Sequence, residues 1–280
     1  GVVNVVVTSS SGSVVGPMLQ DPRVRTLSFT GSTYVGQMLL RQSADRVLRT
    51  SMELGGNAPF LVLEGADVTS AVAGAMIAKM RNGGAACTAA NRFYVHESLV
   101  ADFTREFAAA LSALKVGPGI EQGNDLGAMV SVKERDKIVA LVESAQTGGL
   151  SVQQTAAAPE HGAFVSPMVV TGVQQGSVLT TEEIFGPVAP IVTVTSTQEA
   201  VDFANDTEYG LISYVYAANA GEGIRVGRQM ESGMVAVNRG VASDPAAPFG
   251  GMKQSGLGRE GGFHGIHEFL EPQYLAVDLG

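Results

Sequence analysis

Hydrophobic and polar residues alternate along this chain in a pattern that predicts strands separated by helices. Runs of β-branched and apolar residues are typical of buried strands, and the segments between them repeat apolar residues every three or four positions, as helices packed on a sheet do. The predicted strands are 2–8, 25–30, 47–52, 59–63, 92–96, 187–195, 211–217 and 233–238. The predicted helices cover 14–19, 35–39, 67–80, 99–114, 133–145, 198–205 and 221–230. Such short intervals between strands imply right-handed crossovers and a mainly parallel sheet, and so an α/β fold.

Two segments do not follow this pattern. Residues 239–262 are rich in Gly, Pro, Ser and Ala. A loop of this length is usually functional or disordered. In residues 271–279 every second residue again lies on the same face of an extended chain, with Tyr274 and Ala276 on one face. They predict an edge strand, or a strand exchanged with a second copy, because a strand edge needs a partner.

Composition narrows the class of protein. The chain has 280 residues, 45% of them hydrophobic and 16% charged, which indicates a globular protein large enough for two domains. Its net charge of −9 disfavours binding to nucleic acid or to an anionic membrane. The longest apolar run, 71–78, is too short to cross a bilayer.

The ends and the cysteine content suggest where the chain belongs. A single cysteine excludes an internal disulfide and, with no signal peptide at the start, predicts a cytoplasmic location. The first residue is not Met, and a strand is predicted almost from that residue. We therefore expect the chain to begin partway through a larger protein.

The single cysteine, Cys87, lies in a stretch of small residues between a predicted helix and a predicted strand. A lone cysteine is often buried and inert, but a loop of this kind also suits a nucleophile. Glu53 ends a predicted strand, and Gly55 and Gly56 behind it leave its carboxylate uncovered, as a general base requires. From these residues alone, a cysteine hydrolase that uses one of the four histidines stays open.

Gly31 and Ser32 stand between a strand and a helix, where free backbone N–H groups and the helix dipole favour an anion such as phosphate. Glycine in such turns often serves geometry only, so this segment is a weak indication by itself. No metal site is predicted.

Four motifs in a fixed order make a more specific pattern. They are Glu53-Leu54-Gly55-Gly56-Asn57, the Cys87 loop with Asn91-Arg92 behind it, Glu182-Glu183-Ile184-Phe185-Gly186-Pro187-Val188, and the segment from Pro248 to Glu260. With these motifs the chain resembles the aldehyde dehydrogenase superfamily from residue 1 to about residue 275. The resemblance implies an incomplete Rossmann-type cofactor domain (1–53), an α/β catalytic domain (54–252), a return to the cofactor domain (253–270) and an oligomerisation strand (271–280).

The resemblance also implies roles for individual residues. Cys87 would attack the aldehyde carbon, and Glu53 would activate the water that hydrolyses the resulting thioester. The cofactor would be NAD or NADP, and the assembly a homodimer or homotetramer. Cofactor contacts are implied for Gly31 and Ser32 at the pyrophosphate, Leu54 at the nicotinamide, and Glu183 and Phe185 beside the nicotinamide ribose and ring.

Within the superfamily, the sequence from Lys79 to Asn82 and the sequence after Met252 are most similar to those of the succinate-semialdehyde dehydrogenase group. This likeness implies that Arg81 binds the substrate carboxylate, with the Ser243 hydroxyl as its partner, and that Phe249 walls the aldehyde tunnel. Without the likeness, an arginine that faces the last carbonyls of a helix is an equally good interpretation of Arg81.

Three departures from the family pattern matter. Ala85 stands where the family usually has Gln, so a hydrogen bond that shapes the Cys87 loop is missing. Ala89 replaces a second cysteine that some relatives have, so no regulatory disulfide is expected. Everything the family places before residue 1 is absent, including a group of the oxyanion hole, which can contribute ~3 kcal/mol to catalysis. We therefore expect the isolated chain to bind cofactor poorly. The alternatives are a non-catalytic fragment or interaction subunit of the same fold, or a dehydrogenase for a different aldehyde.

Overall fold

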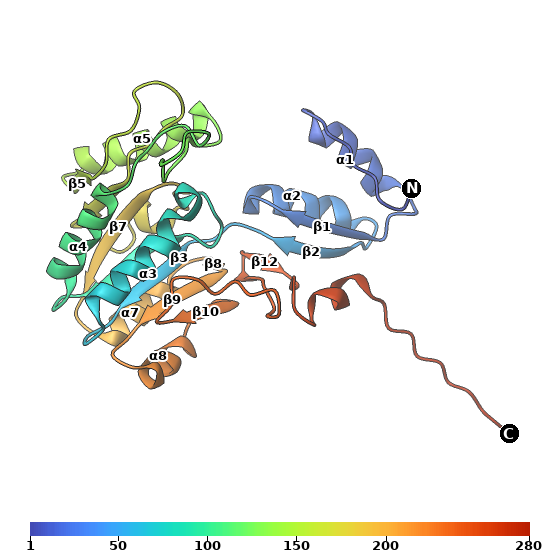
Figure 1. The fold of residues 1–280 in the computed structure, drawn as a ribbon. Helices are drawn as coiled ribbons and strands as arrows, with labels where there is room; N and C mark the ends of the chain where they lie inside the picture. The colour runs from blue at the N-terminus through green and yellow to red at the C-terminus, as the bar shows by residue number, and fades with distance from the viewer.

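The computed structural model describes residues 1–280 and contains two main sheets (Figure 1). The smaller sheet has the order β1 (Thr26–Thr30), β2 (Arg49–Glu53), β12 (Gly256–Leu257). The larger sheet has the order β10 (Met234–Val237), β9 (Ile212–Tyr216), β3 (Ala58–Val62), β4 (Ala90–His96), β7 (Val188–Val194), β6 (Met168–Thr171), β5 (Ser151–Gln154). All neighbours in the larger sheet are parallel except β5 and β6. The predicted α/β class and mainly parallel sheet are confirmed.

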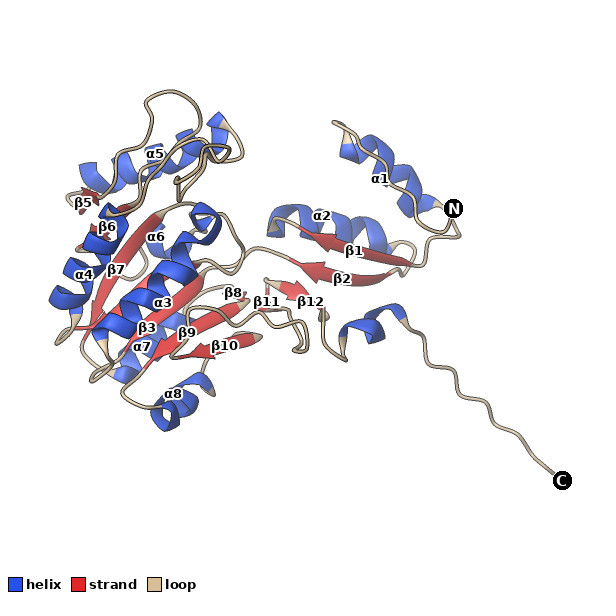
Figure 2. Cartoon of the chain, viewed as in Figure 1, coloured by secondary structure: helices blue, strands red, loops and turns tan.

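The smaller sheet carries helices α1 (Ser11–Gln20) and α2 (Thr33–Ala44). β1 pairs with β2 in parallel, and β12 returns from the far end of the sequence to pair with β2 in the antiparallel direction (Figure 2). The predicted strand at 2–8 is wrong: this segment has no strand, and its valines are largely exposed. The β-branched pattern is present, but no strand of this chain pairs with it, and a strand exists only through its hydrogen bonds to a neighbour.

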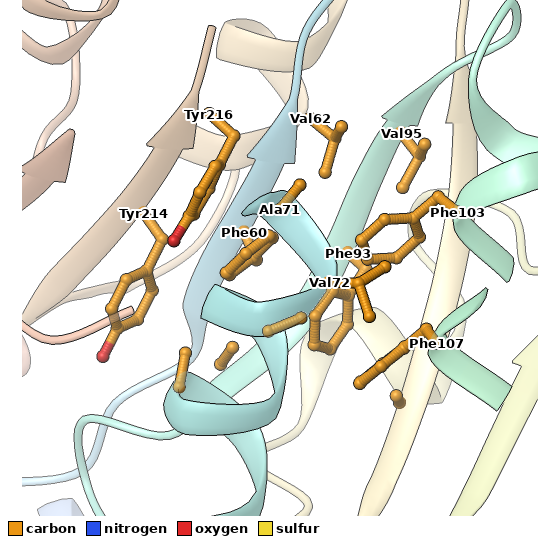
Figure 3. Close-up of a cluster of buried hydrophobic side chains, with 14 of the residues drawn as sticks. Phe60, Val62, Ala71, Val72, Phe93, Val95, Phe103, Phe107, Tyr214 and Tyr216 are labelled. Atoms are coloured by element: carbon orange, nitrogen blue, oxygen red, sulfur yellow. The ribbon is translucent and has the colours of Figure 1, made fainter. Parts of the chain in front are cut away.

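Helices cover both faces of the larger sheet. α3 (Val68–Met80) and α4 (Val100–Ser112) pack on one face, and α5 (Val132–Thr147), α7 (Thr197–Asn205) and α8 (Ala220–Gly227) pack on the other. Because side chains alternate along a strand, Phe60 and Val62 join the first core and Leu61 and Leu63 the second. Figure 3 shows the first core, where the Phe60 ring lies 5.2 Å from that of Phe93 and 5.0 Å from that of Tyr216, centroid to centroid.

The other elements are short. They are α6 (Val178–Thr181), β8 (Tyr209–Gly210), β11 (Met252–Lys253) and the 3₁₀ helices η1 (Arg81–Gly84) and η2 (Gly265–Phe269). β8 pairs with β11 in a separate two-stranded sheet, and β12 pairs with β2, so the irregular segment 239–262 is anchored at two places. Residues 271–280 leave the body as an exposed extended tail (Figure 1), and their pairing with a second copy stays a prediction. None of the helices combines the length and the apolar character needed to cross a membrane.

Candidate active site

Glu53 lies where the chain passes from the smaller sheet to the larger one. It is the last residue of β2, and its backbone is fixed by a hydrogen bond from Gly31 N–H to its carbonyl (3.0 Å) and by pairing with Gly256 of β12. Its side chain is only 3% exposed, and neither carboxylate oxygen has a hydrogen-bond partner. Burial, with a further contribution from the negative charge of Glu260, raises the pKa of Glu53 from 4.5 to about 7, although Arg259 opposes the shift.

Cys87 follows a tight turn at the end of α3. Asn82, Gly83 and Gly84 all have positive φ, and Asn82 closes the turn by donating from Nδ2 to the Ala85 carbonyl at 2.7 Å. A side chain at Gly84 would not fit, since its Cβ would lie 2.3 Å from the Gly186 carbonyl oxygen. The Asn82 bond thus holds a loop that lacks the usual Gln at position 85. Burial, and then the negative charges of Glu183 and Glu53, raise the pKa of the partly buried Cys87 thiol.

Gly56 brings the Glu53 segment against the Cys87 loop. A Cβ at this position would lie 2.5 Å from the Cys87 carbonyl oxygen, so only glycine allows the approach. The structure therefore brings Glu53 and Cys87, which are far apart in sequence, into one site.

Glu183 joins the same site from the segment after α6. Its Oε1 accepts a hydrogen bond from Gly56 N–H at 3.2 Å. Burial raises the pKa of Glu183 to about 7, against the opposing effects of the Gly56 hydrogen bond and of Lys137 and Lys79. Lys79, in the last turn of α3, is completely buried, and no carboxylate lies within 4.0 Å of its Nζ. Burial lowers the pKa of Lys79 to about 7, and the charge of Glu183 acts in the opposite direction.

Two buried asparagines connect the three motifs, and neither was assigned a role from the sequence. Asn91 Nδ2 donates to Asn57 Oδ1 (2.7 Å) and to the Glu182 carbonyl (2.9 Å), while its Oδ1 accepts from Ile184 N–H (3.2 Å). Asn57 Nδ2 donates in turn to the Thr180 carbonyl at 2.9 Å. This asparagine pair links the Glu53 segment, the strand after Cys87 and the Glu183 segment. Both residues stand beside strand starts inside motifs, which is the one sequence signal that could have singled them out.

The residues predicted to contact a dinucleotide come from the start of α2, the segment after β2 and the segment after α6. The first turn of α2 leaves N–H groups without helical acceptors, and its N-cap, Ser32, is exposed next to exposed Gly31. Leu54 packs so closely on Gly36 that a Cβ there would lie 2.3 Å from its side chain. Phe185 has a positive φ of 55° and is 38% exposed.

Phe185 borders an open cleft of about 590 Å³ beside the Cys87 loop. The other lining residues are Asn82, Gly83, Ala85, Asp125, Leu126, Gly127, Ala128, Met129, Val130 and Glu134. The free N–H groups at the start of α2, the Glu183 carboxylate and this cleft suit a nicotinamide dinucleotide.

The residues predicted for the aldehyde come from the end of α3 and from the irregular segment before β11. Arg81 is exposed and donates from Nη2 to Thr88 Oγ1 at 3.0 Å. Phe249 packs against the core cluster that Cys87 also touches, and it lines a pocket of about 190 Å³ together with Ser243. Ser243 and Arg81 make no hydrogen bond to each other, so the predicted pair is not joined directly.

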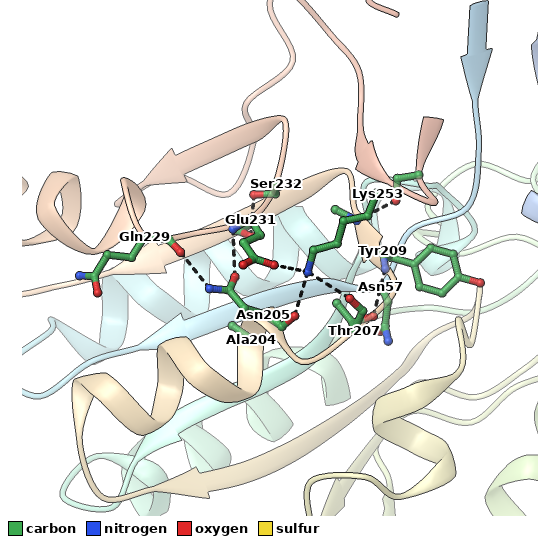
Figure 4. Close-up of polar contacts among 12 residues, drawn as sticks. Asn57, Ala204, Asn205, Thr207, Tyr209, Gln229, Glu231, Ser232 and Lys253 are labelled. Atoms are coloured by element: carbon green, nitrogen blue, oxygen red, sulfur yellow. Dashed lines mark hydrogen bonds and ion pairs between the residues drawn. The ribbon is translucent and has the colours of Figure 1, made fainter. Parts of the chain in front are cut away.

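A network of polar contacts around Lys253 holds the segment that contains β11 and β12 in place (Figure 4). Lys253, which has a positive φ, donates from Nζ to the carbonyls of Asn205 (2.9 Å) and Thr207 (3.1 Å) and pairs with Glu231. Two residues later, Ser255 accepts from Leu54 N–H through its carbonyl at 2.9 Å. The position of Glu53 thus depends on this returning segment.

No histidine bonds to Cys87. The nearest in sequence, His96, ends the seven-residue strand β4 and bonds to Ser98, which places it about 20 Å along the strand from the Cys87 loop. The geometry therefore gives no support to a cysteine–histidine hydrolase. No group of three or more His, Cys, Asp or Glu side chains is arranged as a metal site.

Comparisons with known proteins show which family has this sequence and fold. The family model described as "Aldehyde dehydrogenase family" matches residues 1–275. The chain is 51% identical over 279 residues to the succinate-semialdehyde dehydrogenase of Paenarthrobacter nicotinovorans, and this match covers 99% of the chain and 62% of that protein. Curated relatives are covered over 53% to 62% of their length, so the chain spans little more than half of them.

Solved structures of similar proteins have the same fold as this chain. An NADP-dependent enzyme of Escherichia coli superposes with a TM-score of 0.94 at 39% identity, over 98% of this chain and 57% of that one. The NAD⁺ complex of an aldehyde dehydrogenase from Bacillus cereus gives 0.92 at 33% identity, over 96% and 55%.

Proposed function

The chain belongs to the aldehyde dehydrogenase family, and on that premise we propose that it supplies the nucleophile and the general base for NAD(P)-dependent oxidation of an aldehyde to a carboxylic acid. The observation that carries this proposal is the convergence of Cys87 with Glu53, a buried carboxylate that has no hydrogen-bond partner. Such a group is costly to the fold, and a role in proton transfer accounts for its retention.

Cys87 Sγ acts first. Its thiolate bonds to the aldehyde carbon, and the same sulfur later holds the acyl group as a thioester. Because burial and two neighbouring carboxylates raise the pKa of this thiol, the thiolate is scarce at neutral pH, and the attack is expected to speed up as the pH rises.

Glu53 serves as the base for hydrolysis of the thioester. With a pKa of about 7, it is deprotonated in a useful fraction of molecules near neutral pH and yet binds a proton readily. It takes a proton from a water molecule, the resulting hydroxide adds to the thioester carbon, and collapse releases the carboxylic acid and the Cys87 thiolate.

NAD or NADP is the proposed cofactor, and when bound it supplies the hydride acceptor. Gly31 and Ser32 would hold the pyrophosphate at the α2 N-terminus, Leu54 would support the nicotinamide, and Glu183 would accept hydrogen bonds from its ribose. Phe185 would lie beside the ring from the wall of the cleft.

The proposed substrate is an aldehyde with a carboxylate at its other end, with succinate semialdehyde as the first candidate. Arg81, exposed beside the residue that follows Cys87, is the cation for that carboxylate. Ser243 and Phe249 would line the path of the aldehyde. The named relative from Paenarthrobacter supports this choice.

The direct test is steady-state formation of NADH and NADPH from succinate semialdehyde by the full-length gene product. Cys87→Ala is expected to abolish turnover, and Glu53→Gln to lower kcat by about 10²- to 10⁴-fold, the usual contribution of a general base. Glu97→Gln, at an exposed glutamate, is the matched control and keeps full activity. Turnover by Cys87→Ala would refute the proposal.

A further inference from the structure

Thr88 stands directly after the nucleophile, and none of the motifs gives it a role. We propose that Thr88 is a specificity-determining residue: its hydroxyl holds the Arg81 guanidinium in the position that receives the substrate carboxylate. This inference rests on the proposed function, because it needs Arg81 to be the carboxylate site.

Thr88 is itself fixed from two sides. It is 4% exposed, and its carbonyl accepts a hydrogen bond of 2.7 Å from the hydroxyl of Tyr214, a buried residue of β9. Its side-chain oxygen, Oγ1, accepts a second hydrogen bond, from Arg81 Nη2 at 3.0 Å. Thr88 therefore connects the exposed side chain of Arg81 to the central sheet through two hydrogen bonds.

Arg81 has no other restraint on its charged end. It lies at the junction between α3 and η1, its side chain is exposed, and it forms no ion pair within the chain. A long exposed side chain samples many rotamers, and ordering it costs free energy at the moment of binding. The hydrogen bond to Thr88 restricts that freedom beforehand. A guanidinium has five N–H donors, so the bond to Thr88 leaves the others for a carboxylate.

The location matters as much as the order. Consecutive Cα atoms are about 3.8 Å apart, so the residue that holds Arg81 is the immediate neighbour of the nucleophile. When they are ionised, Glu53 and Glu183 bring negative charge close to Cys87, and they repel an anionic aldehyde. A cation fixed at Thr88 offsets that repulsion and favours aldehydes whose carboxylate lies a short distance from the reacting carbon.

The test compares Thr88→Val, which keeps the shape and the backbone but removes the acceptor, with Thr88→Ser, which keeps a hydroxyl. In the full-length enzyme, Thr88→Val is expected to raise KM for succinate semialdehyde about tenfold, the effect of one lost hydrogen bond to a charged group. Its kcat, and its KM for butanal, which has no carboxylate, are expected to stay within about twofold of wild type, a change too small to count as one hydrogen bond. Thr88→Ser restores most of the affinity for succinate semialdehyde.

Arg81→Ala separates this inference from the function on which it rests. If Arg81→Ala raises KM for succinate semialdehyde selectively while Thr88→Val changes nothing, the role of Thr88 is wrong and the carboxylate site stands. If Arg81→Ala affects both aldehydes equally, the carboxylate site is wrong as well. The double variant is expected to match Arg81→Ala alone, because the hydroxyl acts only through the guanidinium, and additive effects would also overturn the inference.

Discussion

Glu53 keeps a buried carboxyl group without a partner, and this arrangement links catalysis to stability at the scale of one residue. Its folded-state pKa of about 7 lies above the ordinary value of 4.5, so the folded protein binds this proton more tightly than the unfolded chain. The stability it contributes is complete below about pH 4.5 and is lost as the pH rises through 7.

Glu53→Gln is therefore expected to stabilise the protein above pH 7 by about 1–3 kcal/mol, because the amide carries no charge that folding must desolvate, and to have little effect at pH 5. Thermal unfolding followed by circular dichroism at pH 5 and pH 8 measures this difference. Exposed Glu97→Gln should leave both midpoints unchanged. A variant that is less stable than wild type at pH 8 would show that Glu53 is paired in the native state.

Burial contributes most to the raised pKa of Cys87, and among the neighbouring charges that of Glu183 contributes most. Glu183→Gln removes this charge, so the thiol pKa falls and more thiolate is present at any pH below it. We expect iodoacetamide to alkylate Cys87 several-fold faster in this variant at pH 8, as followed by mass spectrometry. An unchanged or slower rate would mean that the Glu183 charge does not reach the sulfur.

Between elements, the Asn57–Asn91 pair is the main polar connection of the site. Asn91→Leu fits a similar volume but leaves the Glu182 carbonyl, Ile184 N–H and Asn57 without their partners. Each such loss costs about 1–3 kcal/mol, so a decrease of several kcal/mol in the free energy of unfolding is expected in urea titrations. The exposed control, Asn4→Leu, should unfold like wild type. Equal stability of Asn91→Leu would contradict the assigned network.

The elements show what local pattern can and cannot determine. Strands such as β3, β4 and β9 were predictable because they are apolar on both faces, and the Asp67 cap of α3 was predictable because it acts within one turn, accepting from Ser70 N–H at 2.8 Å. The segment 2–8 has the same β-branched character but no neighbour in the chain, and pairing is not a local property. β5 was not predicted because Val152 is its only apolar residue, and β6 was not predicted either.

The same limit applies to the site. Cys87 and Glu53 stood out by residue type and setting, and the order of motifs predicted that they meet. The burial of Lys79, the Asn57–Asn91 bond and the Arg81–Thr88 bond depend on side-chain distances between elements, which no spacing along the sequence encodes.

At the scale of the whole molecule, the exposed tail is the clearest unpaired feature. Tyr274, Leu275, Val277 and Leu279 are between 63% and 92% exposed. The division at residues 53, 252 and 270 and the cytoplasmic location stay predictions.

We expect the full-length protein to form a dimer or tetramer, with the tail paired to a second copy's sheet. Leu275→Asp should shift the molar mass in light scattering towards the monomer, while Asp278→Asn should not. Unchanged assembly in Leu275→Asp would exclude the tail as the interface.

The central claim is that Cys87 carries the acyl group and that Glu53 is needed to release it. The most direct measurement is mass spectrometry of the full-length Glu53→Gln variant after mixing with succinate semialdehyde and NAD or NADP. The predicted result is a burst of about one reduced cofactor per active site, the kinetic sign of a trapped acyl-enzyme, together with a succinyl adduct on the peptide that contains Cys87. A burst without an adduct on Cys87, or an adduct on another residue, would contradict the account.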